Sequence, residues 1–219
     1  MNRTVGIAKW RGSISRERTP VGANEAFIAM IGQAWDDIHS VFVASSFEND
    51  MSRRLKWWIQ DEHHDANRPW SVSSQAEEVT FDDNGNIVAI GKPDLWLNVG
   101  SMQILYECKR LNIIDKNGNL SRNQKQYIDE NGIQRFTTEK YSSRTKICGM
   151  IGFVMNGDLA DAQTSIVNSM HQCSSAKAVI NPKKPFPCDN SYRLKTKHKA
   201  DTGKLLHIHH LLLPVGNHV

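Results

Sequence analysis

The chain of 219 residues lacks the features of membrane, secreted or thiolate-metal proteins. No apolar stretch reaches the about 20 residues that a membrane helix needs, and residues 1–12 lack the apolar core of a signal peptide. Its four cysteines, at positions 108, 148, 173 and 188, show no paired spacing of the kind found in zinc sites. We therefore expect a soluble, cytoplasmic protein with reduced thiols and no membrane contact.

Internal repeats and long linkers are also absent, and the length suits one substantial hydrophobic core. Residues 1–19 carry five Lys and Arg side chains and few apolar ones, so we expect them to form a basic N-terminal arm. Residues 20–219 are expected to form a single domain. The net charge of +4 is modest, so its placement matters more than its size for any polyanion partner.

Hydrophobic periodicity predicts an alternation of helices and strands. Apolar residues at helical spacing predict two amphipathic helices, one around residues 24–38 and one around residues 51–59. Two apolar runs joined by Asn84-Gly85 predict a hairpin that continues as a meander through residues 94–109. Beyond it we expect helical segments on both sides of Asn131-Gly132, a buried strand at 146–155 and a helix capped by Asp158.

The C-terminal region concentrates positive charge on what reads as a β-hairpin spanning residues 191–214. Its alternate positions Arg193, Lys195, Lys197 and Lys199 would line one face of a strand, at a spacing of about 6.6 Å that suits successive phosphates. The alternative is a solvated outer face on which lysines discourage edge pairing. Two further nucleic-acid-binding candidates, one helical turn apart, are Lys140 and Arg144.

The most informative local pattern is a second two-residue turn, Gly100-Ser101, between two apolar strand-like runs. If these residues form the turn, Val99 faces Met102 and Asp94 lies directly opposite Glu107. Directly opposed residues have Cβ atoms about 4.5 to 5.5 Å apart, so both carboxylates could share one cation. Because strand side chains alternate, Lys109 points to the same face as Glu107.

Two carboxylates beside a lysine favour a hard divalent cation. Oxygen ligands without clustered Cys or His select Mg²⁺, with Mn²⁺ as a substitute, over zinc. A bound Mg²⁺ polarises phosphoryl oxygens and activates water, and a neighbouring ammonium stabilises the developing charge. The pattern therefore indicates hydrolysis of a phosphodiester. The competing interpretation is that Asp94 and Lys109 are ordinary exposed strand residues.

Pro93-Asp94 followed by Glu107-Cys108-Lys109 resembles the signature of the restriction-endonuclease-like, or PD-(D/E)XK, nuclease superfamily. The resemblance implies an α/β fold with a mixed central sheet flanked by helices in α-βββ-α-β order, here extended by the C-terminal hairpin. It implies that Asp94 and Glu107 bind the metal and that Lys109 acts on the attacking water. The backbone carbonyl of Cys108 and the carboxylate of Glu25 are further implied ligands; otherwise Glu25 complements the helix dipole.

The expected function is accordingly a Mg²⁺-dependent endodeoxyribonuclease. The superfamily implies a role in restriction-modification, antiviral defence against phage, or DNA repair and recombination. With no separate recognition domain in sight, target choice would come from a homodimer, partner protein subunits or loops. Two alternatives stay open at this point: a non-catalytic nucleic-acid-binding subunit of a larger complex, and a nuclease that acts on RNA.

Overall fold

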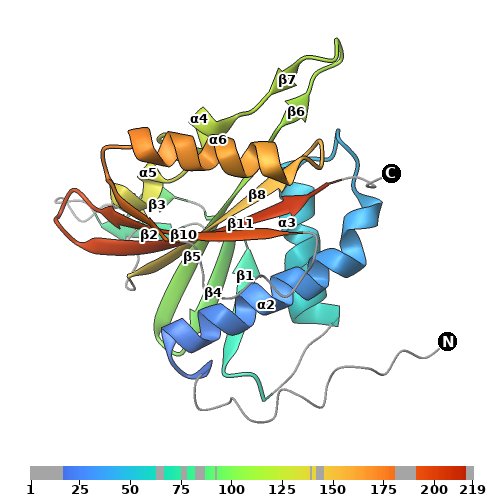
Figure 1. Cartoon of the computed structure of the whole chain (residues 1–219). Helices are drawn as coiled ribbons and strands as arrows, with labels where there is room; N and C mark the ends of the chain where they lie inside the picture. The colour runs from blue at the N-terminus through green and yellow to red at the C-terminus, as the bar shows by residue number, and fades with distance from the viewer. Residues whose placement is uncertain are drawn as a thin grey trace.

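The centre of the molecule is a mixed sheet of seven strands in the order β1-β4-β5-β8-β11-β10-β9, with helices on both faces (Figure 1). This architecture comes from a computed structural model that describes residues 17–62, 67–74, 78–81, 87–91, 93–138, 140–141, 146–180 and 191–215. The predicted α/β class with a mixed central sheet is therefore confirmed. The strands are β1 Trp70–Ser74, β4 Leu95–Val99, β5 Met102–Leu111, β8 Ile147–Val154, β9 Ala176–Ile180, β10 Tyr192–Lys199 and β11 Leu205–Pro214.

Strands β5, β8 and β11 run parallel in the middle of the sheet, and the outer strands pair antiparallel on either side. The pairing of β4 with β5 ends where Leu95 faces Tyr106, whereas β5 continues to Leu111 beside β8. Residues 107–111 of β5 therefore have one strand neighbour among the described residues. Their backbone groups on the other side need different partners.

Helices α2 (Pro20–Ile38) and α3 (Glu48–Trp57) cover one face of the sheet (Figure 1). A 3₁₀ turn, His39–Val41, follows α2, and a π-helical turn, Trp58–Glu62, extends α3. The Thr19 side chain caps α2 by accepting a hydrogen bond from the Gly22 amide at 3.1 Å. Both helices were predicted from their apolar spacing. The same spacing predicts that Trp58 faces the core and Trp57 does not, and Trp58 is indeed 5% exposed whereas Trp57 is 39% exposed.

The opposite face is covered by α4 (Gln124–Ile128), α5 (Gln134–Thr137) and α6 (Leu159–Gln172). The Asp158 side chain caps α6 through the Asp161 amide at 2.9 Å, as the sequence predicts. The break between α4 and α5 falls at the predicted Asn131-Gly132. A Cβ on Gly132 would lie 2.0 Å from the Tyr127 carbonyl oxygen, so the chain can turn back this closely only at a glycine.

The predicted hairpin of two strands before Asp94 is confirmed, although its turn at Asn84-Gly85 lies outside the described residues, but its continuation as a meander into β4 is wrong. Strands β2 (Glu78–Phe81) and β3 (Ile87–Gly91) pair with each other in a separate two-stranded sheet, and β1 takes the place beside β4. The segment of β1 is rich in serine and has just two apolar side chains, Trp70 and Val72, both of which enter the core beneath α2 and α3. A second small hairpin, β6 (Ile113–Ile114) with β7 (Leu120–Ser121), projects from the end of β5 (Figure 1).

The C-terminal hairpin is confirmed, because β10 pairs along its whole length with residues 205–212 of β11. However, β10 is flanked by β9 on its other side, so it is an internal strand. The interpretation of its lysines as protection of a sheet edge is therefore wrong. Residues 1–16 of the predicted arm lie outside the described residues, and Glu17 lies against the domain, where it accepts a hydrogen bond from Trp70 Nε1 at 3.3 Å.

Two cysteines lie in core strands as expected: Cys108 in β5 and Cys148 in β8 are buried free thiols. Cys173 is also free, and Cys188 lies outside the described residues. Within the described part of the chain, none of the helices combines the length and the apolar character that crossing a bilayer requires.

Candidate functional site

The turn between β4 and β5 sets the geometry of the site. Gly100 has φ of +58°, and Val99 faces Met102 in the register that a two-residue turn requires. The pairing continues to Leu95 opposite Tyr106, so the next step places Asp94 beside Glu107, as predicted. Both carboxyl groups are buried: Asp94 is 8% exposed and Glu107 2%.

Carboxylates occupy the side of β5 that β4 leaves without a partner. The Cys108 amide donates to Asp94 Oδ2 at 2.7 Å, and the Arg110 amide donates to Glu48 Oε2 at 3.0 Å. These two amides point where a longer β4 would have supplied carbonyl oxygens. Asp94 and Glu48 therefore continue the hydrogen bonding of the sheet with charged side chains, and they gather negative charge at one strand end.

Lys109 lies at the centre of this charge. Its Nζ donates to Glu107 Oε1 at 2.7 Å, to the Cys108 carbonyl oxygen at 2.7 Å and to Glu48 Oε1 at 3.3 Å. The predicted triad of Asp94, Glu107 and Lys109 is thus brought together, and Glu48, the first residue of α3, joins it. Sequence reasoning missed Glu48, since an acid in the first turn of a helix is ordinarily explained by the helix dipole.

Two further residues hold the Glu107 side chain. Tyr141 donates its hydroxyl hydrogen to Glu107 Oε2 at 2.7 Å, and Arg135 Nη1 lies 3.2 Å from Glu107 Oε1. Arg135 also donates to the Tyr141 hydroxyl oxygen. These contacts could not be predicted from the sequence, because Arg135 in α5 and Tyr141 after it reach Glu107 only through the tertiary fold.

Burial and mutual repulsion perturb the acids of this cluster. Burial, reinforced by the charge of Glu107, raises the pKa of Asp94 to about 7, although the Cys108 amide and Lys109 oppose the shift. Burial also raises the pKa of Glu48, against the attraction of Lys109. For Lys109, burial lowers the pKa, but the charges of Glu107 and Glu48 outweigh it, and the net direction is upward. The lysine is therefore a firmly protonated cation among acids.

The carboxylate oxygens of Asp94, Glu107 and Glu48 are suitable ligands for a hard cation, although they are not arranged around a common point. Among the described residues, no three His, Cys, Asp or Glu side chains are grouped closely enough to hold a metal ion. The Lys109 ammonium lies against the Glu107 carboxylate and the Cys108 carbonyl oxygen. Yet Asp94 Oδ1 receives no hydrogen bond from a described residue, and the oxygens of Asp94, Glu107 and Glu48 are the ligands that Mg²⁺ prefers. The residues present thus fit such an ion chemically.

The structure does not bring Glu25 to this cluster. It lies on α2 and forms a two-pronged ion pair with Arg193 of β10, at 2.8 Å from Nη1 and 2.5 Å from Nη2. Burial raises the pKa of Glu25, but the hydrogen bond and charge of Arg193 outweigh it, so the net shift is downward. Arg193 Nη2 also donates to His209 Nδ1 at 2.9 Å. A structural pairing of α2 with the sheet accounts for these contacts.

The basic residues of β10 alternate with buried ones as predicted. The buried positions are Leu194, Thr196 and His198, and the basic positions between them are Arg193, Lys195, Lys197 and Lys199. Pairing across the sheet puts Lys195 in one row with Tyr106, whereas Leu194 shares a row with Glu107. The basic stripe therefore lies on the α2 face, opposite to Glu107 and Lys109. Lys140 is exposed, and Arg144 lies outside the described residues.

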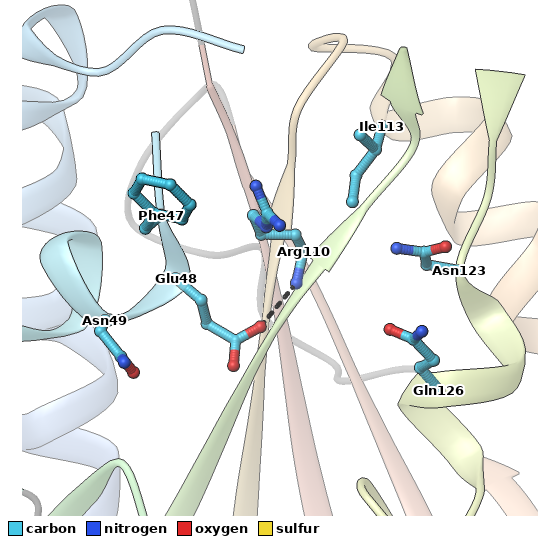
Figure 2. Close-up of a pocket in the computed structure, with 7 residues that line it drawn as sticks. All are labelled: Phe47, Glu48, Asn49, Arg110, Ile113, Asn123 and Gln126. Carbon is cyan, nitrogen blue, oxygen red and sulfur yellow. Dashed lines mark hydrogen bonds between the residues drawn. The ribbon is translucent and has the colours of Figure 1, made fainter. Parts of the chain in front are cut away.

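A small pocket adjoins the carboxylate cluster at the end of β5 (Figure 2). Its volume is about 220 Å³, and it shares Glu48 with the cluster. Phe47 and Asn49 from the start of α3 form one wall, and Asn123 and Gln126 from α4 form the other. Arg110 lies between the two walls (Figure 2).

Comparison with known proteins identifies no relative of this chain. No protein-family model matches the chain, and neither a curated protein nor a solved structure shows significant similarity to it. Function is therefore argued from the chemistry of the cluster. Two buried acids, the half-buried Glu48, a protonated lysine and a neighbouring pocket form an arrangement in which perturbed pKa values indicate a reactive site.

Proposed function

We propose that this chain is a metal-dependent endonuclease of the restriction-endonuclease-like superfamily that hydrolyses DNA phosphodiester bonds. The observation that carries the proposal is the convergence of Asp94, Glu107 and Lys109 at the end of β5 that extends beyond β4. Lys109 and Arg135 compensate the charge of Glu107, but Asp94 is buried beside Glu107 with a pKa raised to about 7, and perturbed acids of this kind gather at functional sites.

The order of elements supports the same superfamily. Helix α2 precedes the three neighbouring strands β1, β4 and β5, which are followed by α4 and α5, then β8 and α6. This is similar to the α-βββ-α-β core that the sequence resemblance implies. Fold likeness alone does not determine function, so the proposal depends on the site.

In the proposed site, Asp94, Glu107, Glu48 and the Cys108 carbonyl oxygen would hold one Mg²⁺ or Mn²⁺ after a shift of side chains, because among the described residues these acids are not grouped closely enough as they stand. When bound, such an ion polarises a phosphoryl oxygen and lowers the pKa of a coordinated water. Lys109 remains protonated, so it orients the attacking water and donates hydrogen bonds to the charge that develops on the phosphoryl oxygens. It does not act as a general base.

Arg135 and Tyr141 position the Glu107 carboxylate rather than touching the substrate. Their hydrogen bonds fix the orientation of the side chain, so that Lys109 can release Oε1 without loss of geometry. The proposed partners are DNA and either a second copy of the chain or other protein subunits. A place in restriction, antiviral defence or DNA repair follows from the superfamily resemblance and is part of the same proposal.

The test is nicking of supercoiled plasmid by purified protein with Mg²⁺ or Mn²⁺ and with EDTA. Lys109→Ala should slow nicking by at least about 100-fold, comparable to the loss of one preorganised donor at a reacting centre. Lys56→Ala is the matched control, because Lys56 is paired with Asp61 on the surface of α3 at 2.8 Å. Unchanged nicking by Lys109→Ala would contradict the proposed role, and an RNA substrate run in parallel decides which polymer is cleaved.

A second candidate function is a non-catalytic nucleic-acid-binding subunit. It is favoured by the saturation of Glu107, whose two oxygens already accept hydrogen bonds from Lys109 and Tyr141. Salt-sensitive binding of DNA with no metal-dependent cleavage of DNA or RNA would support this candidate over the nuclease.

A further inference from the structure

The pocket beside Glu48 combines an exposed aromatic ring with several hydrogen-bonding groups. Phe47 is 66% exposed, the highest value among the exposed large apolar side chains of the described residues. The Arg110 guanidinium lies 5.8 Å from the centre of the Phe47 ring and donates to the Ser46 carbonyl oxygen at 3.4 Å. One wall of the pocket thus offers an aromatic ring with a cation over it.

The opposite wall carries two amide side chains (Figure 2). Asn123 has φ of +52°, and its Oδ1 accepts a hydrogen bond from Ser121 Oγ at 2.6 Å, which leaves its NH₂ group as a donor. No described residue forms a hydrogen bond with the side-chain amide of Gln126. Ile113 closes the end of the pocket with an apolar side chain. This wall therefore offers hydrogen-bond donors and an acceptor, and the Asn123 amide is oriented by Ser121.

We propose that this pocket takes one unstacked nucleobase of the nucleic-acid substrate, with its ring against Phe47 and its polar edge toward Asn123 and Gln126. Aromatic rings and Asn or Gln amides are the groups that bind splayed-out bases. The volume of about 220 Å³ lies below the about 300 to 1,000 Å³ of ordinary small-molecule sites, so it suits a single base. Glu48 in its wall disfavours a bare phosphate.

The inference rests on the proposed function, and it specifies the substrate of the same site. Glu48 belongs both to the pocket and to the carboxylate cluster, so a base held here belongs to a nucleotide next to the scissile phosphate. The nuclease would then favour nucleic acid with an unpaired or extruded base, because unstacking a paired base costs a few kcal/mol.

The test uses the full chain in EDTA, where no cleavage occurs. The probes are two DNA oligonucleotides that carry 2-aminopurine, one at an unpaired bulge and one within a perfect duplex. Wild type should bind the bulged probe more tightly and quench its fluorescence by stacking. Phe47→Ala should weaken that binding by about 5- to 150-fold, the range expected for losing one base–aromatic stack. The control is Val43→Ala, which removes another exposed side chain that does not line the pocket.

Two further readouts complete the test. Gln126→Ala should weaken binding of the bulged probe without changing the slope of affinity against salt, since a base contact releases no counterions. Equal affinity of wild type for both probes, or unchanged binding by Phe47→Ala, would overturn the base pocket. Plasmid nicking without a preference for the bulge would leave the nuclease proposal standing and the pocket refuted. Preferential binding of the bulged probe with no cleavage in any metal would support the base pocket and refute the nuclease proposal.

Discussion

Replacing Asp94 with Asn should stabilise the protein at alkaline pH, because burial and repulsion by Glu107 destabilise the ionised Asp94 carboxylate. Burial and the charge of Glu107 raise the pKa of Asp94 from 3.8 to about 7. Asn keeps an oxygen that can accept the hydrogen bond from the Cys108 amide, which now ends on Asp94 Oδ2 at 2.7 Å. The substitution therefore removes the charge and preserves the cap.

The size and the pH window of this effect follow from the pKa difference. A difference of about 3 pH units corresponds to about 4 kcal/mol, at about 1.36 kcal/mol per unit. Between pH 3.8 and about 7 the folded protein holds a proton on Asp94 that the unfolded chain has released. The contribution of Asp94 to the free energy of unfolding therefore falls as pH rises through this window and is constant above it.

The assay is unfolding by guanidinium chloride at pH 4 and pH 8, with Asp94→Asn compared to wild type at each pH. We expect a gain of up to about 4 kcal/mol at pH 8 and almost none at pH 4. Asp61→Asn is the control, since it breaks a surface ion pair and should change stability by about 1 kcal/mol or less. If Asp94→Asn were less stable than wild type at pH 8, the Asp94 carboxylate would not be destabilised by its burial.

Three other predictions concern the site and the core. Glu48→Gln should slow plasmid nicking by about 10- to 100-fold with folding intact. The Gln oxygen can still accept the hydrogen bond from the Arg110 amide, but the negative charge beside Lys109 is lost. Gly149→Ala should lower the free energy of unfolding by at least about 1 to 3 kcal/mol in denaturant titrations, since its Cβ would lie 2.0 Å from the Tyr106 ring. Burial lowers the pKa of His198 to about 4, so between pH 6.5 and 4 the unfolded chain binds a proton that the folded protein excludes. Stability should then fall by up to about 3 kcal/mol on acidification across that window, and His198→Gln should remove this part of the dependence.

Much of the fold could be predicted because the turn residues and the hydrophobic pattern of the sequence favour the same local structures that the tertiary packing requires. The turn at Gly100-Ser101 fixes the register of β4 and β5, and the hydrophobic period of the flanking runs places the same residues inside. The cap at Asp158 and the break at Gly132 were likewise readable, because each depends on the conformation of a few adjacent residues.

The sheet order was not readable, because it depends on contacts between distant segments. Strand β1 has too few apolar residues to compete with the stronger strand pattern of β3, yet it pairs with β4 and buries Trp70 and Val72. The alternation of Lys195 and its neighbours was predictable from a period of two. The face that they occupy was not, since it depends on β10 being three strands away from β5.

The residues of the candidate site likewise fall into those that local sequence could predict and those that depend on contacts between distant segments. Asp94, Glu107 and Lys109 lie within one hairpin, so their proximity could be worked out from residue numbers alone. Glu48 lies 61 residues before Lys109, and it reaches the cluster because α3 begins beside the end of β5 that extends beyond β4. Glu25, the helical acid that the sequence put forward, lies with Arg193 instead.

The most direct test of the account is the rate of Mg²⁺-dependent plasmid nicking by wild type and by Asp94→Asn, measured on samples whose stability at pH 8 is known. The account predicts nicking by wild type that EDTA abolishes, and a rate at least about 100-fold lower for a variant that is as stable as wild type or more so. Equal rates for the two proteins, or wild-type nicking that persists in EDTA, would contradict the assignment of Asp94 and its neighbours as a metal-dependent nuclease centre.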